Sequence, residues 1–186
     1  MEGSHSGLVR IPGKDVCPKG HRGFKSLTLR QKIYMKYFSL AIVIKSFTLL
    51  ITTRIHFKSE SIGQKIFVNG QEYTIFRHAI LKNQQEPQGI FCVWFGTKMS
   101  PSKTKILSIF TMIAFMGFPG WTSKKWLVND KTADFGGIYE FDTVENTKKY
   151  QNSYAMKFSK WRSSEGNFRT EVFDRQKFPY QNILEN

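Results

Sequence analysis

Residues 121–141 read WTSKKWLVNDKTADFGGIYEF, and this stretch decides the fold. The runs 121–128 and 135–141 are rich in aromatic and β-branched residues, a composition typical of strands. Asn129-Asp130-Lys131-Thr132 between them has the composition of a turn. Gly136-Gly137 stands early in the second run, where glycine in a strand indicates close backbone approach or a bulge. The stretch therefore predicts two neighbouring strands joined by a short loop.

The segments on either side of this pair complete a pattern of six elements. An apolar strand at 90–95 and a helix at about 102–116 precede it. A second helix, which Asp142 begins, and a last strand at 168–173 follow it. The order strand-helix-strand-strand-helix-strand is the ferredoxin-like arrangement of an α+β protein. Both helices then cover one face of the sheet, so we expect a second copy of the module or an added segment on the other face.

Two further segments precede this module. Asn69-Gly70 lies between two β-rich runs, and both residues tolerate the positive φ angles of a type I′ turn, which predicts a hairpin. A strongly apolar segment comes before the hairpin. We therefore expect a flexible basic tail at 1–28, an apolar helix at 29–58, a β-hairpin extension at 64–82, the ferredoxin-like module at 88–176 and a C-terminal tail at 177–186.

The apolar helix leaves three interpretations open. The span from Tyr37 to Ile55 has about the 20 residues that a membrane-spanning helix needs, but Lys45 lies at its centre, where a charge is costly. The helix could instead lie on an anionic membrane surface through its basic flanks, or pack on the rest of the protein. The expected location is membrane-associated or cytoplasmic, and the Lys and Arg residues before Tyr37 favour an N-terminus inside.

The net charge of +14, from 28 Lys and Arg against 14 Asp and Glu, first suggests nucleic acid as a partner. Residues 1–60 hold 11 of the basic residues and 3 of the acidic ones, around the apolar helix. The chain has no zinc-finger spacing, no Arg-rich recognition helix and no RNA-binding signature. The distribution of charge therefore indicates an anionic membrane surface as the partner, and no specific nucleic acid is expected.

The number and spacing of the cysteines and histidines do not indicate a metal site. The two cysteines, Cys17 and Cys92, exclude a disulfide framework and a four-cysteine zinc site. No cluster of His, Cys, Asp and Glu has the spacing of metal ligands, and the four histidines all lie outside the module. We expect neither a metal nor another cofactor.

Several motifs of the module resemble one known family. They are Pro119-Gly120, Lys124-x-Trp126, Gly136-Gly137-Ile138-Tyr139-x-Phe141, Tyr150 and Val172-Phe173-Asp174. In this spacing they resemble the YdhR-type mono-oxygenases, of the dimeric α+β barrel group, over about residues 88–175. The resemblance implies a homodimer through the sheet faces, a pocket between sheet and helices, and mono-oxygenase activity. Family members often carry a His shortly after the matched Tyr150, where this chain has Asn152-Ser153-Tyr154.

An aromatic pocket with a few polar groups is the candidate site. Lys124 and Tyr154 are the candidate catalytic residues, and the candidate substrate-binding residues are Trp94, Trp126, Asn129 and Tyr139. Cofactor-free oxygenation of an electron-rich aromatic molecule needs a dry pocket and groups that stabilise the substrate anion. Lys124 would supply the positive charge. The simpler interpretation makes Trp126 and Tyr139 core or interface aromatics and Lys124 a solvated lysine.

Three functions remain open on the sequence. The first is a membrane-associated, cofactor-independent mono-oxygenase that acts on or binds an aromatic or hydrophobic small molecule. The second is a non-catalytic dimeric module that binds a hydrophobic ligand or a partner and is tethered by its N-terminal helix. The third is a structural dimer without a ligand. An enzyme predicts that Lys124 and Tyr154 point into a cavity.

Overall fold

The computed structural model describes residues 29–82, 85–97, 99–164 and 166–184, so the tail expected at 1–28 lies outside the described residues. The helices are α1 (Leu29–Ile51), α2 (Pro101–Phe115), α3 (Val144–Gln151) and α4 (Tyr154–Arg162), with short 3₁₀ turns η1 (Arg175–Lys177) and η2 (Gln181–Ile183). The strands are β1 (Ile55–Phe57), β2 (Lys65–Val68), β3 (Gln71–Leu81), β4 (Gly89–Phe95), β5 (Trp121–Val128), β6 (Phe135–Phe141) and β7 (Arg169–Asp174).

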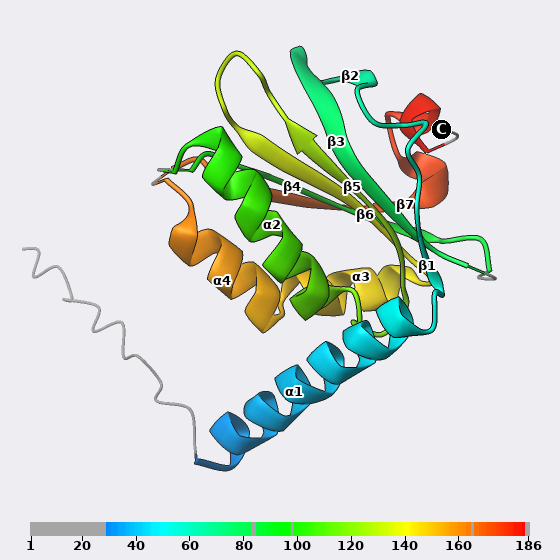
Figure 1. Ribbon diagram of the computed structural model, residues 1–186, viewed down its shortest axis with the longest axis vertical. Helices are drawn as coiled ribbons and strands as arrows, with labels where there is room; N and C mark the ends of the chain where they lie inside the picture. Colours follow the sequence, from blue (N-terminus) through cyan, green and yellow to red (C-terminus); the bar gives the residue numbers. More distant parts are fainter. Residues whose placement is uncertain (1–28, 83–84, 98, 165, 185–186) are drawn as a thin grey trace, which may run out of the picture.

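One sheet holds all of these strands, in the order β1-β3-β5-β6-β4-β7, with β2 paired to the other end of β3. The neighbouring pairs are antiparallel. Helix α2 joins β4 to β5, and α3 with α4 joins β6 to β7, so the four strands β5-β6-β4-β7 have ferredoxin-like connections (Figure 1). The predicted α+β, ferredoxin-like fold is confirmed.

The hairpin extends this sheet beyond β5. Strands β2 and β3 pair around Asn69 and Gly70, whose φ angles are 51° and 75°. Positive φ at both central residues is what a type I′ turn requires, and Asn and Gly accept it at low cost. The other side of β3 pairs with β5, so the predicted hairpin becomes part of the main sheet.

The N-terminal helix packs against the module. The Gly117 amide, just after α2, donates a hydrogen bond to Ser46 Oγ of α1 at 2.6 Å. Ile42 and Leu49, on the same side of α1 as Ser46, are buried in the core. None of the helices in the described part of the chain has the length and hydropathy that crossing a membrane requires.

The second helix of the module is interrupted. The predicted single helix from Asp142 is wrong, because α3 ends at Gln151 and α4 begins at Tyr154. Asn152 leaves the helical conformation with ψ near 5°, and Ser153 begins α4 in extended conformation. Thr143, not Asp142, caps α3, since its hydroxyl oxygen accepts a hydrogen bond from the Asn146 amide at 3.1 Å.

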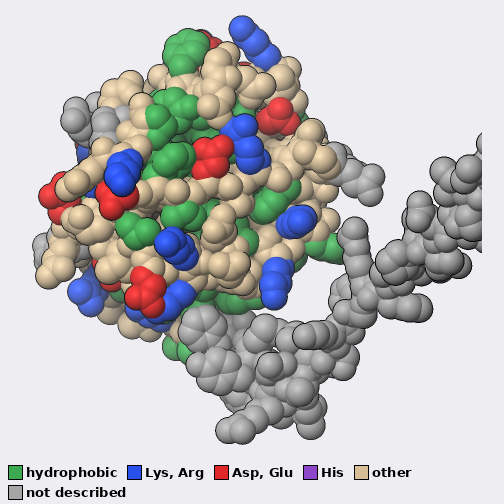
Figure 2. Space-filling view, turned by 180° about the vertical axis from the view of Figure 1, so that it is seen from behind, with side chains coloured by type: hydrophobic (Ala, Val, Ile, Leu, Met, Phe, Trp, Pro, Cys, Tyr) green, Lys and Arg blue, Asp and Glu red, His purple; other side chains and the backbone are tan. Residues whose placement is uncertain are grey.

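The two faces of the sheet carry separate cores. The helix side packs under α2, α3 and α4 and includes Phe91, Val93, Trp126 and Tyr139. The opposite side is covered by the C-terminal segment and by hairpin side chains, and its buried residues are Ile66, Val68, Tyr73, Ile75, Ile90, Cys92, Trp94, Leu127, Ile138, Phe178 and Ile183. Seen from behind, hydrophobic and charged side chains of both signs are interspersed (Figure 2). An added segment therefore covers this face, and the homodimer stays a prediction.

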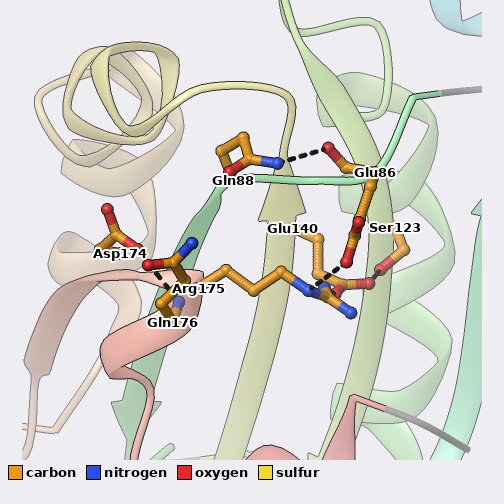
Figure 3. A network of polar contacts seen from close by, with 7 residues as sticks. All are labelled: Glu86, Gln88, Ser123, Glu140, Asp174, Arg175 and Gln176. Atoms are coloured by element: carbon orange, nitrogen blue, oxygen red, sulfur yellow. Dashed lines mark hydrogen bonds and ion pairs between the residues drawn. The ribbon is translucent and has the colours of Figure 1, made fainter.

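A polar network fixes the C-terminal segment to the sheet (Figure 3). The Arg175 guanidinium forms an ion pair with Glu140 of β6, and Glu140 in turn accepts a hydrogen bond from the Ser123 hydroxyl of β5. Arg175 Nε also lies 3.5 Å from Glu86 Oε1. Lys125 of β5 adds a hydrogen bond from its amine to the Ile183 carbonyl. The buried carboxylate of Glu140 is therefore paired with Arg175 on the sheet face away from the helices.

Candidate functional site

A buried lysine stands at the centre of the helix side of the sheet. Lys124 of β5 and Tyr139 of β6 are register partners, and both side chains point toward the helices. Lys124 Nζ donates a hydrogen bond to the Tyr139 hydroxyl oxygen at 2.5 Å. The same nitrogen lies 4.1 Å from the centre of the Tyr139 ring and 4.3 Å from that of Trp126. The amine is therefore enclosed by two aromatic rings and held by one hydroxyl.

The protein environment favours the uncharged amine. Burial lowers the pKa of Lys124 well below its ordinary value, and the positive charges of Arg162 and Arg77 lower it further. Burial also raises the pKa of Tyr139 to about 12, so its hydroxyl stays protonated at neutral pH. A lysine whose amine is uncharged can accept a proton, which makes Lys124 a candidate base.

Two arginines complete a cluster of positive charge. Arg77 of β3 donates a hydrogen bond from Nη1 to Ser108 Oγ of α2 at 2.8 Å. Arg162 of α4 stacks its guanidinium over the Phe95 ring at 5.2 Å. Burial lowers the pKa of both arginines. Among the described residues that line this space none is acidic, so the charge has no carboxylate partner there.

The cluster surrounds a narrow inner cavity between the sheet and helices α2 and α4. Its volume is about 20 Å³, which is room for about one water molecule. Four buried polar atoms of its lining have no hydrogen-bond partner among the described residues; they are Nε and Nη1 of Arg162, Nε1 of Trp126 and Oγ1 of Thr104. Three of the four are N–H donors, so the cavity presents positive charge and free donors to an occupant.

Glycine makes room for this arrangement. A Cβ atom at Gly137 would lie 2.8 Å from the Tyr139 ring and 3.5 Å from Cε of Lys124. On the opposite face, a Cβ atom at Gly136 would lie 2.4 Å from the Trp94 ring. The close neighbours of these two glycines are side chains on both sides of the sheet, rather than the approaching backbone or bulge that the sequence predicts.

The predicted catalytic Tyr154 lies elsewhere. It lines an outer pocket of about 260 Å³ with Phe118, Pro119, Ser153 and Lys157. Burial raises the pKa of Tyr154. The two spaces share no lining residue. They are nevertheless neighbours, because the ring of Phe115 in the inner lining contacts the Tyr154 ring, with centroids 5.8 Å apart.

Two other predicted residues also lie apart from Lys124. Trp94 is on the opposite face of the sheet, where its ring lies 5.1 Å from that of Tyr73. Asn129 follows β5, and its side-chain oxygen accepts hydrogen bonds from the amides of Lys131 and Thr132 at 2.9 and 3.1 Å. These two hydrogen bonds give Asn129 a structural role in the β5–β6 turn.

The structure therefore brings together three of the six predicted site residues, namely Lys124, Trp126 and Tyr139. Sequence reasoning misses Arg77, because the predicted hairpin lies outside the module. It also misses Arg162, the last residue of α4. In the described part of the chain, no three His, Cys, Asp or Glu residues are close enough to hold a metal.

Comparison with known proteins gives only structural likeness. No family model matches the chain, and no curated protein matches it. One similar solved structure is an uncharacterized ferredoxin-fold protein from Listeria monocytogenes related to antibiotic biosynthesis monooxygenases, at 14% identity and a TM-score of 0.46 over 60% of this chain and 69% of that one. Another is a major regulator of staphylococcal pathogenesis, at 14% identity and a TM-score of 0.43 over 59% and 71%. The fold assignment rests on the strand order and connections of this chain, and the narrower YdhR-type assignment stays a prediction.

Proposed function

We propose that this protein binds a small aromatic or otherwise hydrophobic molecule with an acidic hydroxyl group, and that this hydroxyl meets Lys124. The observation that carries the proposal is a fully buried amine with a lowered pKa beside Arg77 and Arg162, with no acidic residue in the described lining. Arg77 and Arg162 are half-buried cations, and such charges are costly unless something compensates them. An occupant that becomes an anion in the site supplies that compensation.

The chemistry of such an occupant follows from the residues present. The uncharged Lys124 amine accepts the proton of a phenol or enol, which leaves an ammonium beside the new anion. The free N–H groups of Arg162 and Trp126 are donors for the anionic oxygen. The rings of Trp126 and Tyr139 provide apolar walls for the rest of the molecule.

Cofactor-independent oxygenation is the reaction that this arrangement suits. An electron-rich phenolate gives electrons to molecular oxygen more readily than the neutral phenol does, and a water-poor space beside cations would stabilise that anion. For a phenol such as 1-naphthol, one oxygen atom becomes the second carbonyl of the quinone, and the other leaves as water. The substrate supplies all four electrons, so the balance closes without a separate reductant. Lys124 takes the hydroxyl proton in the first step.

The small volume of the inner cavity limits which molecules can reach Lys124. A cavity of about 20 Å³ does not admit an aromatic ring as it stands. Binding must therefore displace side chains of α2 or α4, among them Arg162, whose Nε and Nη1 have no hydrogen-bond partner among the described residues. The occupant gains the contacts of the cationic cluster in return.

The outer pocket favours a second candidate function, which is ligand binding without turnover. Its volume of about 260 Å³ is large enough for a small organic molecule, and Phe118, Pro119 and Tyr154 give it apolar walls. Lys124 takes no part there, because it does not line the outer pocket.

Titration with 1-naphthol and its methyl ether tests the proposal. The two probes share the ring system, but only 1-naphthol has a proton to give. We expect the wild-type protein to bind 1-naphthol about tenfold more tightly than the ether, and the Lys124→Met variant to lose that preference. Lys148→Met, which replaces an exposed lysine, is the matched control and should keep it. Equal affinity of the wild type for both probes would contradict the proposal, and tight binding that only outer-pocket substitutions abolish would favour the second candidate.

A further inference from the structure

Helix α1 carries two apolar stripes on opposite sides. Ile42, Ser46 and Leu49 face the protein core. Leu40, Ile44, Phe47 and Ile51 follow the spacing i, i+4, i+7, i+11 and are between 49% and 77% exposed. At 3.6 residues per turn, the outer stripe lies roughly 180° from the core-facing one. The helix thus satisfies its packing with one face and leaves a second hydrophobic face directed away from the protein.

This outer stripe lies at the edge of the molecule. Figure 1 shows α1 along one border, outside the sheet and the helices that cover it. Lys45 is exposed but lies well off the stripe by the same helical geometry. The central lysine that argues against a spanning helix is therefore no obstacle to surface contact by the stripe.

Three of the four helices, α1, α2 and α4, carry charges of one sign only, whereas α3 also carries Glu145. The sequences of α1, α2 and α4 contain no Asp or Glu at all, whereas they contain nine Lys and Arg residues: Arg30, Lys32, Lys36, Lys45, Lys103, Lys105, Lys157, Lys160 and Arg162. Further exposed apolar side chains belong to the same helices, with Ile106 and Phe110 on α2 and Trp161 on α4. The acidic residues of the chain thus lie outside these three helices.

We infer that the outer stripe of α1 docks on the surface of an anionic lipid bilayer. Apolar side chains beside lysines, with no acid among them, match the acyl boundary and the negative headgroups of such a surface. A second copy of the chain is a poorer match, because it would bring two basic surfaces together. This inference is independent of the inner cavity and of any ligand in it.

Vesicle co-sedimentation of the full chain tests this inference. The probes are vesicles of phosphatidylcholine with one quarter phosphatidylglycerol, and vesicles of phosphatidylcholine alone. We expect binding to the anionic vesicles that weakens as salt is raised, and little binding to the neutral ones. The double variant Ile44→Glu/Phe47→Glu should reduce the partition coefficient by about tenfold or more, because it removes apolar contact and adds repulsion. Phe67→Glu, on an exposed strand position of β2, is the matched control and should bind as the wild type does.

Several results would overturn the inference. Absence of binding to anionic vesicles would do so, as would equal binding to both vesicle types. Anionic binding that the double variant leaves unchanged would assign the contact to another basic part of the chain. A lipid-free wild-type dimer that the double variant converts to a monomer would make a second copy the occupant of the stripe. Because both substituted residues are exposed, the unfolding temperature of the variant should stay near that of the wild type, which separates loss of docking from loss of fold.

Discussion

Lys124 and Tyr139 face each other across the β5–β6 pair, and the lysine amine donates a 2.5 Å hydrogen bond to the tyrosine hydroxyl. Adjacent antiparallel strands place register partners on the same side of a sheet, so the pairing follows from the strand register alone. Gly137, beside Tyr139, leaves the space that the ring and the lysine stem occupy. The centre of the candidate site is thus built into the sheet rather than into a loop.

Replacing the buried lysine should stabilise the protein. The folded-state pKa of Lys124 is below that of the unfolded chain, so at neutral pH protonation of the unfolded chain favours unfolding. Lys124→Met removes this penalty and keeps most of the side-chain volume. We expect the free energy of unfolding in urea to rise by about 1–2 kcal/mol. A fall of similar size would mean that the contacts of Lys124 with Tyr139 and Trp126 are structural.

Gly136 should tolerate no side chain. A Cβ atom there would lie 2.4 Å from the Trp94 ring, and packing on both faces leaves little room for either group to shift. We expect Gly136→Ala to lower the free energy of unfolding by about 1–3 kcal/mol. Combining it with Trp94→Leu should cost less than the two single changes added together, because the smaller side chain removes the clash. Strict additivity in this double-mutant cycle would contradict the contact.

Stability should fall in mild acid because of His78. Burial, helped by the positive charges of Lys125 and Lys58, lowers its pKa from 6.5 to about 3, and its ring nitrogen lies 2.7 Å from Ser61 Oγ. The folded protein keeps the ring neutral, whereas the unfolded chain takes up a proton below pH 6.5. The free energy of unfolding should therefore decrease as pH falls from about 6.5 toward about 3, by on the order of 2–4 kcal/mol from this group.

Urea titrations at several pH values measure this effect. His78→Gln should flatten the pH dependence in that window, since its side chain takes up no proton. His56→Gln, at an exposed strand position, is the matched control and should keep the wild-type slope. A wild-type slope in the His78→Gln variant would assign the acid sensitivity to other groups.

The C-terminal segment should keep the sheet face from self-association. Phe178 and Ile183 cover the core that contains Ile90 and Ile138. Deleting residues 175–186 exposes these side chains and leaves Glu140 without Arg175. We expect the shortened chain to be less stable and to form dimers or larger species in sedimentation velocity, because a large apolar sheet face requires a partner. A stable monomer would show that the remaining side chains suffice to cover the face.

Local sequence signals explain most of the fold. Asn69-Gly70 predicts its turn, and the six elements of the module are recognisable from their apolar patterns. The break at Asn152-Ser153 was missed because Tyr150 and Tyr154 keep helical spacing across it. The C-terminal cover was missed because its apolar residues lie in two short 3₁₀ turns that have no period to detect.

The site was harder to predict, since sequence does not say which face of the sheet each residue occupies. Alternation along one strand relates Lys124 to Trp126, but it does not relate either residue to Trp94 on another strand. That relation depends on register, and β5 has an irregularity between Trp121 and Ser123. Arg77 reaches the site only because β3 joins the sheet beside β5, a long-range pairing with its own register shift between Ile75 and Arg77.

The ionisation state of a bound phenol tests the central claim most directly. 4-Nitrophenol absorbs at different wavelengths as phenol and as phenolate, so its spectrum reports proton transfer in the site. The measurement is made at a pH where the free probe is mainly protonated, with protein in excess. If Lys124 accepts the proton, wild-type protein and Lys148→Met will show the phenolate band, and Lys124→Met will not. A bound probe that stays protonated in the wild type, or a phenolate band that persists without Lys124, would contradict the account.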